Sequence, residues 1–216
     1  MDYIERILSF ILQNRRGHDE GLIPRTAAFA HCPKPTITLE CPNIGPTGSK
    51  IPSKYGFFEE GSFPALKWSL PSDLLPEGKE VKEWFLAVED PDAPLAIPVA
   101  HGLYYSIPAD RTSVTDADFE KVRSPVPGGD GRSISDDFEL KGGFKYGLNR
   151  RKMVYIPPRG MLGHGPHRCF YEIVALSEKI DTTKLSRTGA TREELVKQLE
   201  GKVVAWGEWM GVWERT

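Results

Sequence analysis

Two histidines and a group of carboxylates are the residues of this sequence best suited to chemistry. The stretch EDPDAP, residues 89–94, places three carboxylates, Asp90 among them, on a turn that its prolines make rigid. His101 begins the apolar run that follows, and His167 precedes another such run within GHGPHR. If these segments converge where strands end, two imidazoles and a carboxylate could bind an anion, activate a water molecule or hold a metal ion.

Each of these residues also has a structural interpretation. The aspartates of an Asp-Pro turn often accept hydrogen bonds from nearby backbone N–H groups, and the motif taken alone favours that role. A metal ion is the weakest functional option, because no histidine pair has the spacing of a helical zinc motif. Cys169 is expected to be a packed, inert thiol rather than a nucleophile, since no orienting third group is identifiable. His164 is left open, pointing either into the site or into solvent.

Runs of aliphatic and aromatic residues predict the strands that would position these side chains. No regular alternation with helices and no repeat is present, so the pattern favours a mainly β fold over a parallel α/β array. The five tryptophans are expected to fill the core or cover a sheet edge rather than to form a ligand box. The predicted strands are Thr36–Leu39, VKEWFLAVED, HGLYYSIPAD, RCFYEIVAL and KVVAWGEWMGVW.

A helix is predicted over residues 2–16, where apolar residues recur at helical spacing. We expect its apolar face to dock on the core, and a membrane-surface helix is the alternative. The residues that define this face are Ile4, Ile7, Leu8, Ile11 and Leu12.

A second helix is predicted over residues 191–200. Thr191 and Glu194 have the spacing of a capping box, and Leu195 and Leu199 share one face. Between the two predicted helices, residues 124–152 are rich in glycine and charge, which is typical of either a functional loop or a surface insertion.

Composition restricts the class of protein and its partners. With 216 residues and 39% hydrophobic content, the chain fits a single domain, residues 1–216. The 28 Lys and Arg nearly balance the 30 Asp and Glu, so no overall basic field indicates nucleic acid or an anionic membrane, although a local patch would escape this count. Three cysteines without CxxC spacing, and no signal or transmembrane pattern, favour a cytoplasmic protein. Without nucleotide or GxSxG motifs, we expect no cofactor.

Together these motifs resemble the signature of the phosphatidylethanolamine-binding protein family, which includes the Raf kinase inhibitor proteins and plant flowering regulators. EDPDAP, His101, the pair Pro157 and Pro158, Gly160 and GHGPHR occur in the family's order. The C-terminal stretch RTGATREELVKQLEGKVVAWGEWMGVWER is similar to the family's last helix and strand, and NRRGHDE is typical of its fungal branch.

The resemblance implies an antiparallel β-sandwich with peripheral helices near both termini and a small anion-binding pocket at one end. Within that pocket, Arg168 is expected to pair with a carboxylate such as Asp92 rather than with the ligand. The residues that the resemblance assigns to the pocket and its surroundings are Asp90, Asp92, Ala93, Pro94, His101, Gly165, Pro166, His167, Arg168 and Cys169.

The chain departs from the family pattern at two places. Cys169 stands where the family usually has tyrosine, and the lead-in to the two prolines carries Arg150, Arg151 and Lys152 in place of a Gly-rich stretch. The shape of the pocket and its selectivity for a lipid headgroup therefore do not follow from the resemblance.

Three functions remain as hypotheses. The first is binding of an anionic small molecule or phospholipid headgroup, together with a possible protein partner. The second is an isomerase, cyclase or dehydratase of a fungal pathway, in which Asp90, His101 and His167 perform acid–base catalysis. The third is inhibition of a kinase or protease, for which no motif is identifiable. A biosynthetic gene cluster would favour the enzyme.

Overall fold

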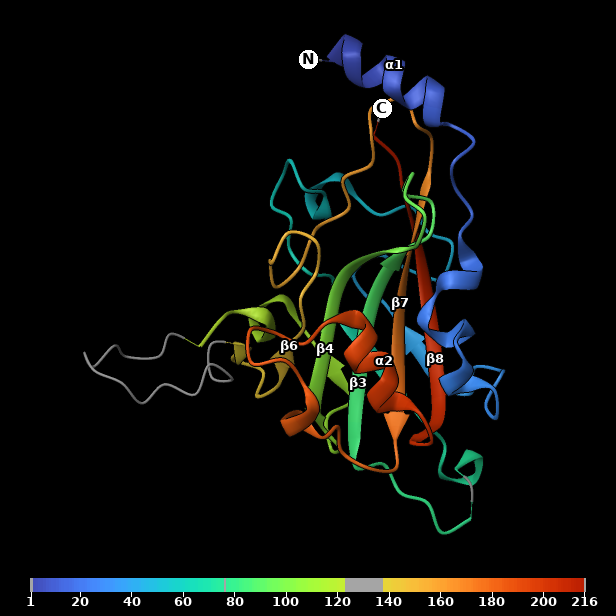
Figure 1. Ribbon diagram of the computed structural model, residues 1–216, viewed down its shortest axis with the longest axis vertical. Coiled ribbons are helices and arrows are strands. Elements are labelled where there is room, and N and C mark those ends of the chain that lie inside the picture. The colour runs from blue at the N-terminus through green and yellow to red at the C-terminus, as the bar shows by residue number, and fades with distance from the viewer. Residues whose placement is uncertain (1, 76, 123–137, 216) are drawn as a thin grey trace, which may run out of the picture.

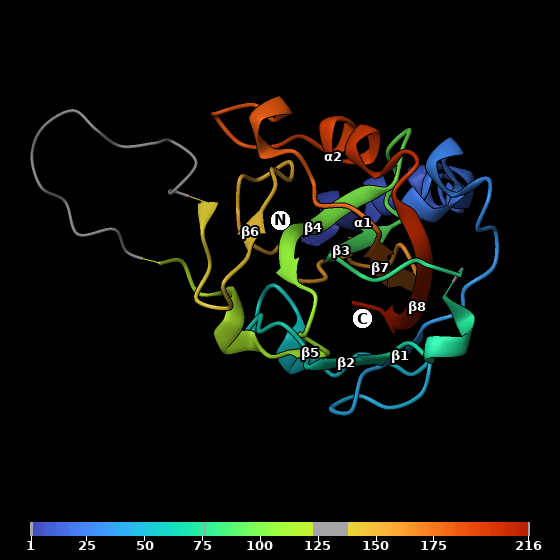
Figure 2. The same cartoon turned by 90° about the horizontal axis from the view of Figure 1, so that it is seen from below.

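Two antiparallel sheets form the centre of the protein in a computed structural model that describes residues 2–75, 77–122 and 138–215. The larger sheet has the order β6-β4-β3-β7-β8, and the smaller one the order β1-β2-β5. Figure 2 shows the smaller sheet lying across one face of the larger. The larger sheet comprises β3 (Glu83–Asp90), β4 (Val99–Pro108), β6 (Lys145–Tyr146), β7 (His167–Leu176) and β8 (Val203–Trp213), and the smaller comprises β1 (Thr38–Glu40), β2 (Leu66–Ser69) and β5 (Ser113–Val114).

The long predicted strands are confirmed, and the apolar runs explain why they form. Every residue of β3 is buried, because β3 lies in the middle of the larger sheet and both of its faces are covered. One face packs against the smaller sheet through Leu86 and Trp68. The other packs against helix α2 (Arg192–Leu199) and the N-terminal turns through Phe85. All five tryptophans are buried, as expected of core residues.

Helix α2 begins and packs as its sequence predicts. The hydroxyl of Thr191 accepts a hydrogen bond from the backbone N–H of Glu194 at 3.2 Å, and the Glu194 carboxylate accepts one from the N–H of Thr191 at 2.9 Å. Leu195 and Leu199 are completely buried against the larger sheet. The helix therefore covers the sheet with the face that the spacing of its leucines indicates.

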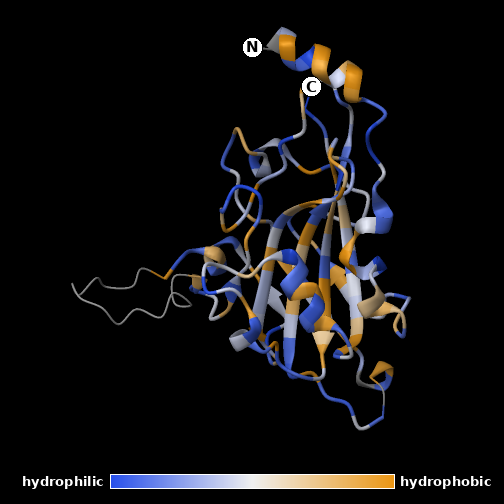
Figure 3. Cartoon of the chain, in the orientation of Figure 1, coloured by the Kyte–Doolittle hydropathy of each residue, from blue (hydrophilic) through white to orange (hydrophobic). Residues whose placement is uncertain are grey.

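Helix α1 (Asp2–Leu12) contradicts the prediction that its apolar face docks on the core. It lies at one end of the longest axis of the molecule, beside the C-terminal end of the chain (Figure 1). Its large apolar side chains are between 44% and 78% exposed, whereas Ser9 on the opposite side is fully buried. The apolar bands of α1 are visible at this end in Figure 3. The exposed side chains are Tyr3, Ile4, Ile7, Leu8, Phe10 and Ile11.

The physical reason is the polar surface beneath α1. There the Glu5 carboxylate accepts a hydrogen bond from the N–H of Leu162 at 3.2 Å and binds Arg215 at 2.7 Å. This surface gives the Glu5 carboxylate its partners, whereas an apolar side chain in the same place would leave the Leu162 N–H and the Arg215 guanidinium without an acceptor. The helix is also shorter than predicted, ending at Leu12. In the part of the chain that the structure describes, no helix is long and apolar enough to cross a membrane.

The loop predicted over residues 124–152 falls partly outside the described residues, which resume at Phe138. Its described part leads through β6 to Asn149, a buried residue that bonds to the site described below. Short 3₁₀ helices complete the described chain at Asp19–Gly21, Ile23–Arg25, Ala27–Phe29, Ser53–Tyr55, Ser72–Leu74, Asp116–Phe119 and Thr182–Lys184.

Candidate functional site

The ends of three adjacent strands bring Asp90, His101 and His167 together. Asp90 ends β3, His101 lies near the start of β4, and His167 begins β7, with β3 between the other two. Nδ1 of His167 is 2.8 Å from Oδ2 of Asp90, and Nε2 of His101 is 3.8 Å from the same oxygen. All three side chains are buried. The three segments whose convergence we hypothesised from sequence therefore meet at one carboxylate.

The second oxygen of Asp90 holds the turn that follows. Oδ1 accepts hydrogen bonds from the N–H groups of Asp92 at 2.8 Å and Ala93 at 3.1 Å. The Asp90 side chain therefore both holds the backbone of the EDPDAP turn and contacts the two histidines. Burial opposes ionisation of Asp90, but its contacts with His101 and His167 outweigh that effect and hold its pKa well below the usual range. Asp90 is a carboxylate at neutral pH.

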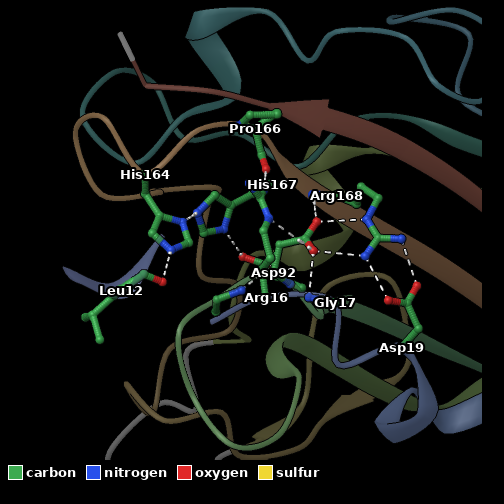
Figure 4. Close-up of polar contacts among 11 residues, drawn as sticks. Leu12, Arg16, Gly17, Asp19, Asp92, His164, Pro166, His167 and Arg168 are labelled. Carbon is green, nitrogen blue, oxygen red and sulfur yellow. Dashed lines mark hydrogen bonds and ion pairs between the residues drawn. The ribbon is translucent and has the colours of Figure 1, made fainter. Parts of the chain in front are cut away.

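The predicted pair between Arg168 and Asp92 is present. The Arg168 guanidinium donates to both oxygens of Asp92, at 2.8 and 2.9 Å, and to both oxygens of Asp19 at 2.8 Å. Figure 4 shows the guanidinium between the two carboxylates. Burial opposes ionisation of Asp92, but the bonds from Arg168 outweigh it and lower the pKa. Because its donors are occupied, Arg168 braces the turn rather than facing a ligand.

His164 is the residue of this site that sequence reasoning did not assign. It is buried, its Nδ1 lies 2.9 Å from Nε2 of His167, and its Nε2 lies 3.1 Å from the carbonyl oxygen of Leu12 (Figure 4). The chain reaches this position through Gly163 and Gly165, which have φ values of +80° and +91°. The glycines on either side of His164 were the available signal, since they permit a tight turn that faces one histidine toward the other.

The hydrogen-bond roles fix the number of protons that the two imidazoles share. The Leu12 carbonyl can only accept, so Nε2 of His164 donates, and the Asp90 carboxylate likewise requires a proton on Nδ1 of His167. The contact between the two rings needs one further proton. Two neutral imidazoles carry only two N–H groups, so this contact is a hydrogen bond when the pair carries a third proton, and with it a positive charge next to Asp90.

Burial lowers the pKa of His164, the hydrogen bond to Leu12 opposes that change, and coulombic repulsion from His167 adds to it. With its Nε2 proton donated to the Leu12 carbonyl, neutral His164 presents Nδ1 as an acceptor toward Nε2 of His167. Nε2 of His167 is therefore the position for a proton shared between the two rings.

His101 is held by backbone on its far side. Its Nδ1 donates to the carbonyl of Ile156, and its own carbonyl accepts from the N–H of Ile156 at 2.8 Å and from the Asn149 side chain at 3.1 Å. These bonds fix the proton on Nδ1 and aim Nε2 at the site. Among the described residues, Nε2 of His101 has no hydrogen-bond partner closer than the 3.8 Å contact with Asp90.

The segment from α1 to Asp19, which we call the N-terminal strap, covers this end of the sheet. Besides the Leu12 carbonyl, Arg16 donates to the carbonyl of Pro166, and the N–H of Gly17 donates to Asp92 at 3.1 Å. The N–H of His18 donates to the carbonyl of Pro91 at 3.0 Å. The strap thus bonds to both loops that carry the site residues, and it contributes to their burial.

The other residues that the resemblance assigned to the pocket lie at its margin. Ala93 is buried, Pro94 and Gly165 are half-buried, and Pro166 is exposed. Cys169 points into the core between the sheets, where burial raises the pKa of its thiol well above the usual value. A thiol with this pKa is a poor nucleophile. Among the described residues, no group of three or more histidine, cysteine or acidic side chains is arranged to hold a metal ion.

A cavity of about 440 Å³ lies next to the segment that fixes His101. Tyr155 and Pro157 line it, whereas the carbonyl of Ile156, between them, bonds to His101. Asp90, His101 and His167 are not among its lining residues. We therefore build the candidate site on the side-chain geometry at the strand ends and not on this cavity.

Comparisons with known proteins agree with this fold. The chain is 40% identical over 212 residues to the phomoidride biosynthesis cluster protein B of Talaromyces stipitatus, covering 98% of this chain and 81% of that protein. It is 38% identical to the protein of the same name from Fungal sp., covering 99% and 95%. The structure of Escherichia coli YbcL superposes with a TM-score of 0.63 at 22% identity, covering 84% of this chain and 99% of that one.

A second solved structure, a phosphatidylethanolamine-binding protein homologue from Chlamydia trachomatis, superposes with a TM-score of 0.61 at 22% identity, covering 85% of this chain and all of that one. At this identity the two structures support the fold alone. The model of the family described as phosphatidylethanolamine-binding protein matches residues 43–214, which include the whole of the larger sheet, strands β2 and β5 of the smaller one, and all the strand-end residues of the site. The chain therefore belongs to the phosphatidylethanolamine-binding protein family.

Proposed function

We propose that the protein binds an anionic small molecule, through a phosphate or carboxylate group, at the site formed by Asp90, His101 and His167. The observation that carries this proposal is the pair of buried imidazoles around a single carboxylate. Nε2 of His101 faces the site and has no hydrogen-bond partner within the described chain. Both ring nitrogens of His167 are already bonded, to Asp90 and His164, so a proton shared in that row would attract an anion by its charge. A protonated imidazole forms short, strong charge-assisted hydrogen bonds to oxyanions. A phospholipid headgroup is one member of this ligand class.

Calorimetric titration with inorganic phosphate and with glycerophosphoethanolamine tests the proposal. We expect His101→Gln to weaken binding of whichever anion the wild type holds by about tenfold or more, because Nε2, the ring nitrogen that faces the site, is lost. His31→Gln is the matched control, since His31 bonds to Val203 at the far end of β8. Equal affinity of wild type and His101→Gln would refute the site.

Acid–base catalysis on a small metabolite is the second candidate, as an isomerisation, cyclisation or dehydration. The specific observation in its favour is the hydrogen-bonded row of His164, His167 and Asp90, along which a proton can shift without crossing solvent. The two fungal relatives are named as products of a biosynthesis cluster, which supports a role in the metabolism of small molecules.

The two candidates differ in the effect of the protein on metabolites. An extract from a host strain that lacks the gene is incubated with purified protein and followed by mass spectrometry. Catalysis predicts that many equivalents of one compound disappear per protein, that His167→Ala abolishes this, and that His164→Asn lowers kcat more than it raises KM. Pure binding predicts at most one equivalent bound and no new product.

Two further expectations stay with this proposal. All three cysteines are free thiols, which supports a reducing compartment such as the cytoplasm. Inhibition of a kinase or protease stays a prediction, and no residue is assigned to it. Substitutions in residues 124–152 would test it, but much of that segment lies outside the described residues.

A further inference from the structure

The apolar face of helix α1 points outward, and its polar face points toward the rest of the protein. With about 100° between successive residues, the side chains of Tyr3, Ile4, Ile7, Leu8, Phe10 and Ile11 span about 160° of its circumference, centred opposite Ser9. These six are half of the twelve large hydrophobic side chains that are exposed among the described residues. A patch of this kind, concentrated on one element, indicates an interaction surface.

The inner contacts of α1 prevent the helix from rolling its apolar face inward. Ser9 is completely buried, Glu5 bonds to Leu162 and Arg215, and the Leu12 carbonyl accepts from His164. Rotating the helix about its axis would break these bonds and leave polar groups buried without partners. The apolar face is therefore directed outward by the fold, away from the described part of the chain.

The shape and position of α1 favour a flat, fluid partner. A helix of 11 residues is about 16 Å long and presents its apolar side chains on a convex surface, without a groove for a second chain. The helix lies at the extreme end of the molecule (Figure 1), where a planar surface can reach it. A bilayer accepts such a helix without a complementary groove.

The charges beside the apolar face point to an anionic surface. Arg6 and Arg15 are exposed at the helix and just after it. The carboxylate of Glu5 is neutralised by Arg215 on the inner side. Cationic side chains that flank an apolar helical face add electrostatic attraction to anionic lipids. We propose that α1 is an interfacial helix that inserts its Tyr3–Ile11 face into the surface of an anionic lipid bilayer.

Flotation with large unilamellar vesicles tests this proposal. The full chain is mixed with vesicles of phosphatidylcholine containing about 30% phosphatidylserine, and with vesicles of phosphatidylcholine alone. We expect the wild type to float with the anionic vesicles, and the double variant Ile4→Ser/Ile11→Ser to lose about tenfold or more in partition. Raising the salt from about 0.1 M to about 1 M should weaken the binding, because the screening length falls from about 10 Å to about 3 Å.

Two controls distinguish insertion of this helix from nonspecific apolar adsorption and from headgroup capture. The double variant Leu74→Ser/Ile97→Ser removes exposed apolar side chains outside α1 and should float like the wild type. His101→Gln removes the ring nitrogen that faces the proposed anion site and should float as well if insertion, and not headgroup capture, holds the protein on the vesicle. Unchanged thermal unfolding of the α1 variant would verify that it is folded.

Three outcomes would overturn the proposal. In the first, the wild type binds neither kind of vesicle. In the second, the α1 variant and the control variant partition equally onto the anionic vesicles. In the third, the wild type sediments as a dimer that the α1 substitutions dissociate. The last result would assign the helix to a second copy of the chain. Since the phosphate titration uses no vesicles, its result does not depend on any of these outcomes.

Discussion

Helices α1 and α2 are both amphipathic, yet they lie on their neighbours in opposite ways. Beneath α2, the larger sheet presents apolar side chains such as Phe85 and Val174, and α2 buries Leu195 among them. Beneath α1, the loops present a peptide N–H, an imidazole and a guanidinium, and α1 turns Glu5 and its last carbonyl toward them. The difference teaches that the surface which receives a helix decides which face it buries.

The largest effect expected from this comparison concerns packing. Leu195→Ala should lower the free energy of unfolding by about 2–5 kcal/mol, because Leu195 is fully buried and its removal leaves a cavity. Ile11→Ala on α1 should change it by no more than about 0.5 kcal/mol, because that side chain is 67% exposed. Urea denaturation of both variants measures the difference. Similar losses of unfolding free energy in the two variants would mean that the outer face of α1 is packed in solution. That result would contradict the contrast between the two helices.

A smaller effect is expected at the start of α2. Thr191→Ala should cost about 1 kcal/mol of unfolding free energy, because the N–H of Glu194 loses its acceptor. Thr191→Ser keeps a hydroxyl and should recover most of the loss. The exposed Thr188 serves as control, and its substitution by alanine should have little effect. If Thr188→Ala costs as much as Thr191→Ala in the same denaturation series, the cap does not stabilise α2.

The regions beneath α2 and beneath α1 also differ in their buried ionisable groups. Glu172 lies on the α2 side of the sheet, is completely buried, and pairs across β7 and β8 with Glu208. Neither of its carboxylate oxygens has a hydrogen-bond partner among the described residues. Burial, followed by the charge of Glu89, raises the pKa of Glu172 well above the usual value. At the α1 end of the molecule, the buried carboxylate of Asp90 faces two imidazoles instead, and its pKa is lowered.

The smallest effect is therefore a change in pH dependence. A raised pKa in the folded state contributes stability that is present below the unfolded pKa of about 4.3 and is lost as the pH rises toward the folded value. Glu172→Gln cannot lose that proton, so the variant should gain stability relative to the wild type between about pH 5 and about pH 8. Denaturation curves at both pH values check this. Parallel pH profiles of the two proteins would show that Glu172 is not protonated in the folded state.

The strands could be predicted because apolar runs of eight to eleven residues have few other stable arrangements in a chain of this composition. The proximity of Asp90, His101 and His167 could be proposed from the sequence, because each residue lies at the end of such a run. The contact of His164 was not, because it depends on two left-handed glycines and on a carbonyl 152 residues away. The orientation of α1 was mispredicted for the same reason, since it depends on distant polar groups.

The N-terminal strap contacts the site partly through main-chain atoms. The Leu12 carbonyl and the N–H groups of Gly17 and His18 are present whatever side chains those positions carry. The residue type matters at Gly17, which has a φ of +76°, and at Arg16 and Asp19, whose side chains bond to Pro166 and Arg168. The strap precedes the residues that the family model matches. In evolutionary terms, such a segment can change many of its other side chains and still cover the site, so relatives with different leading sequences can share a covered strand-end site.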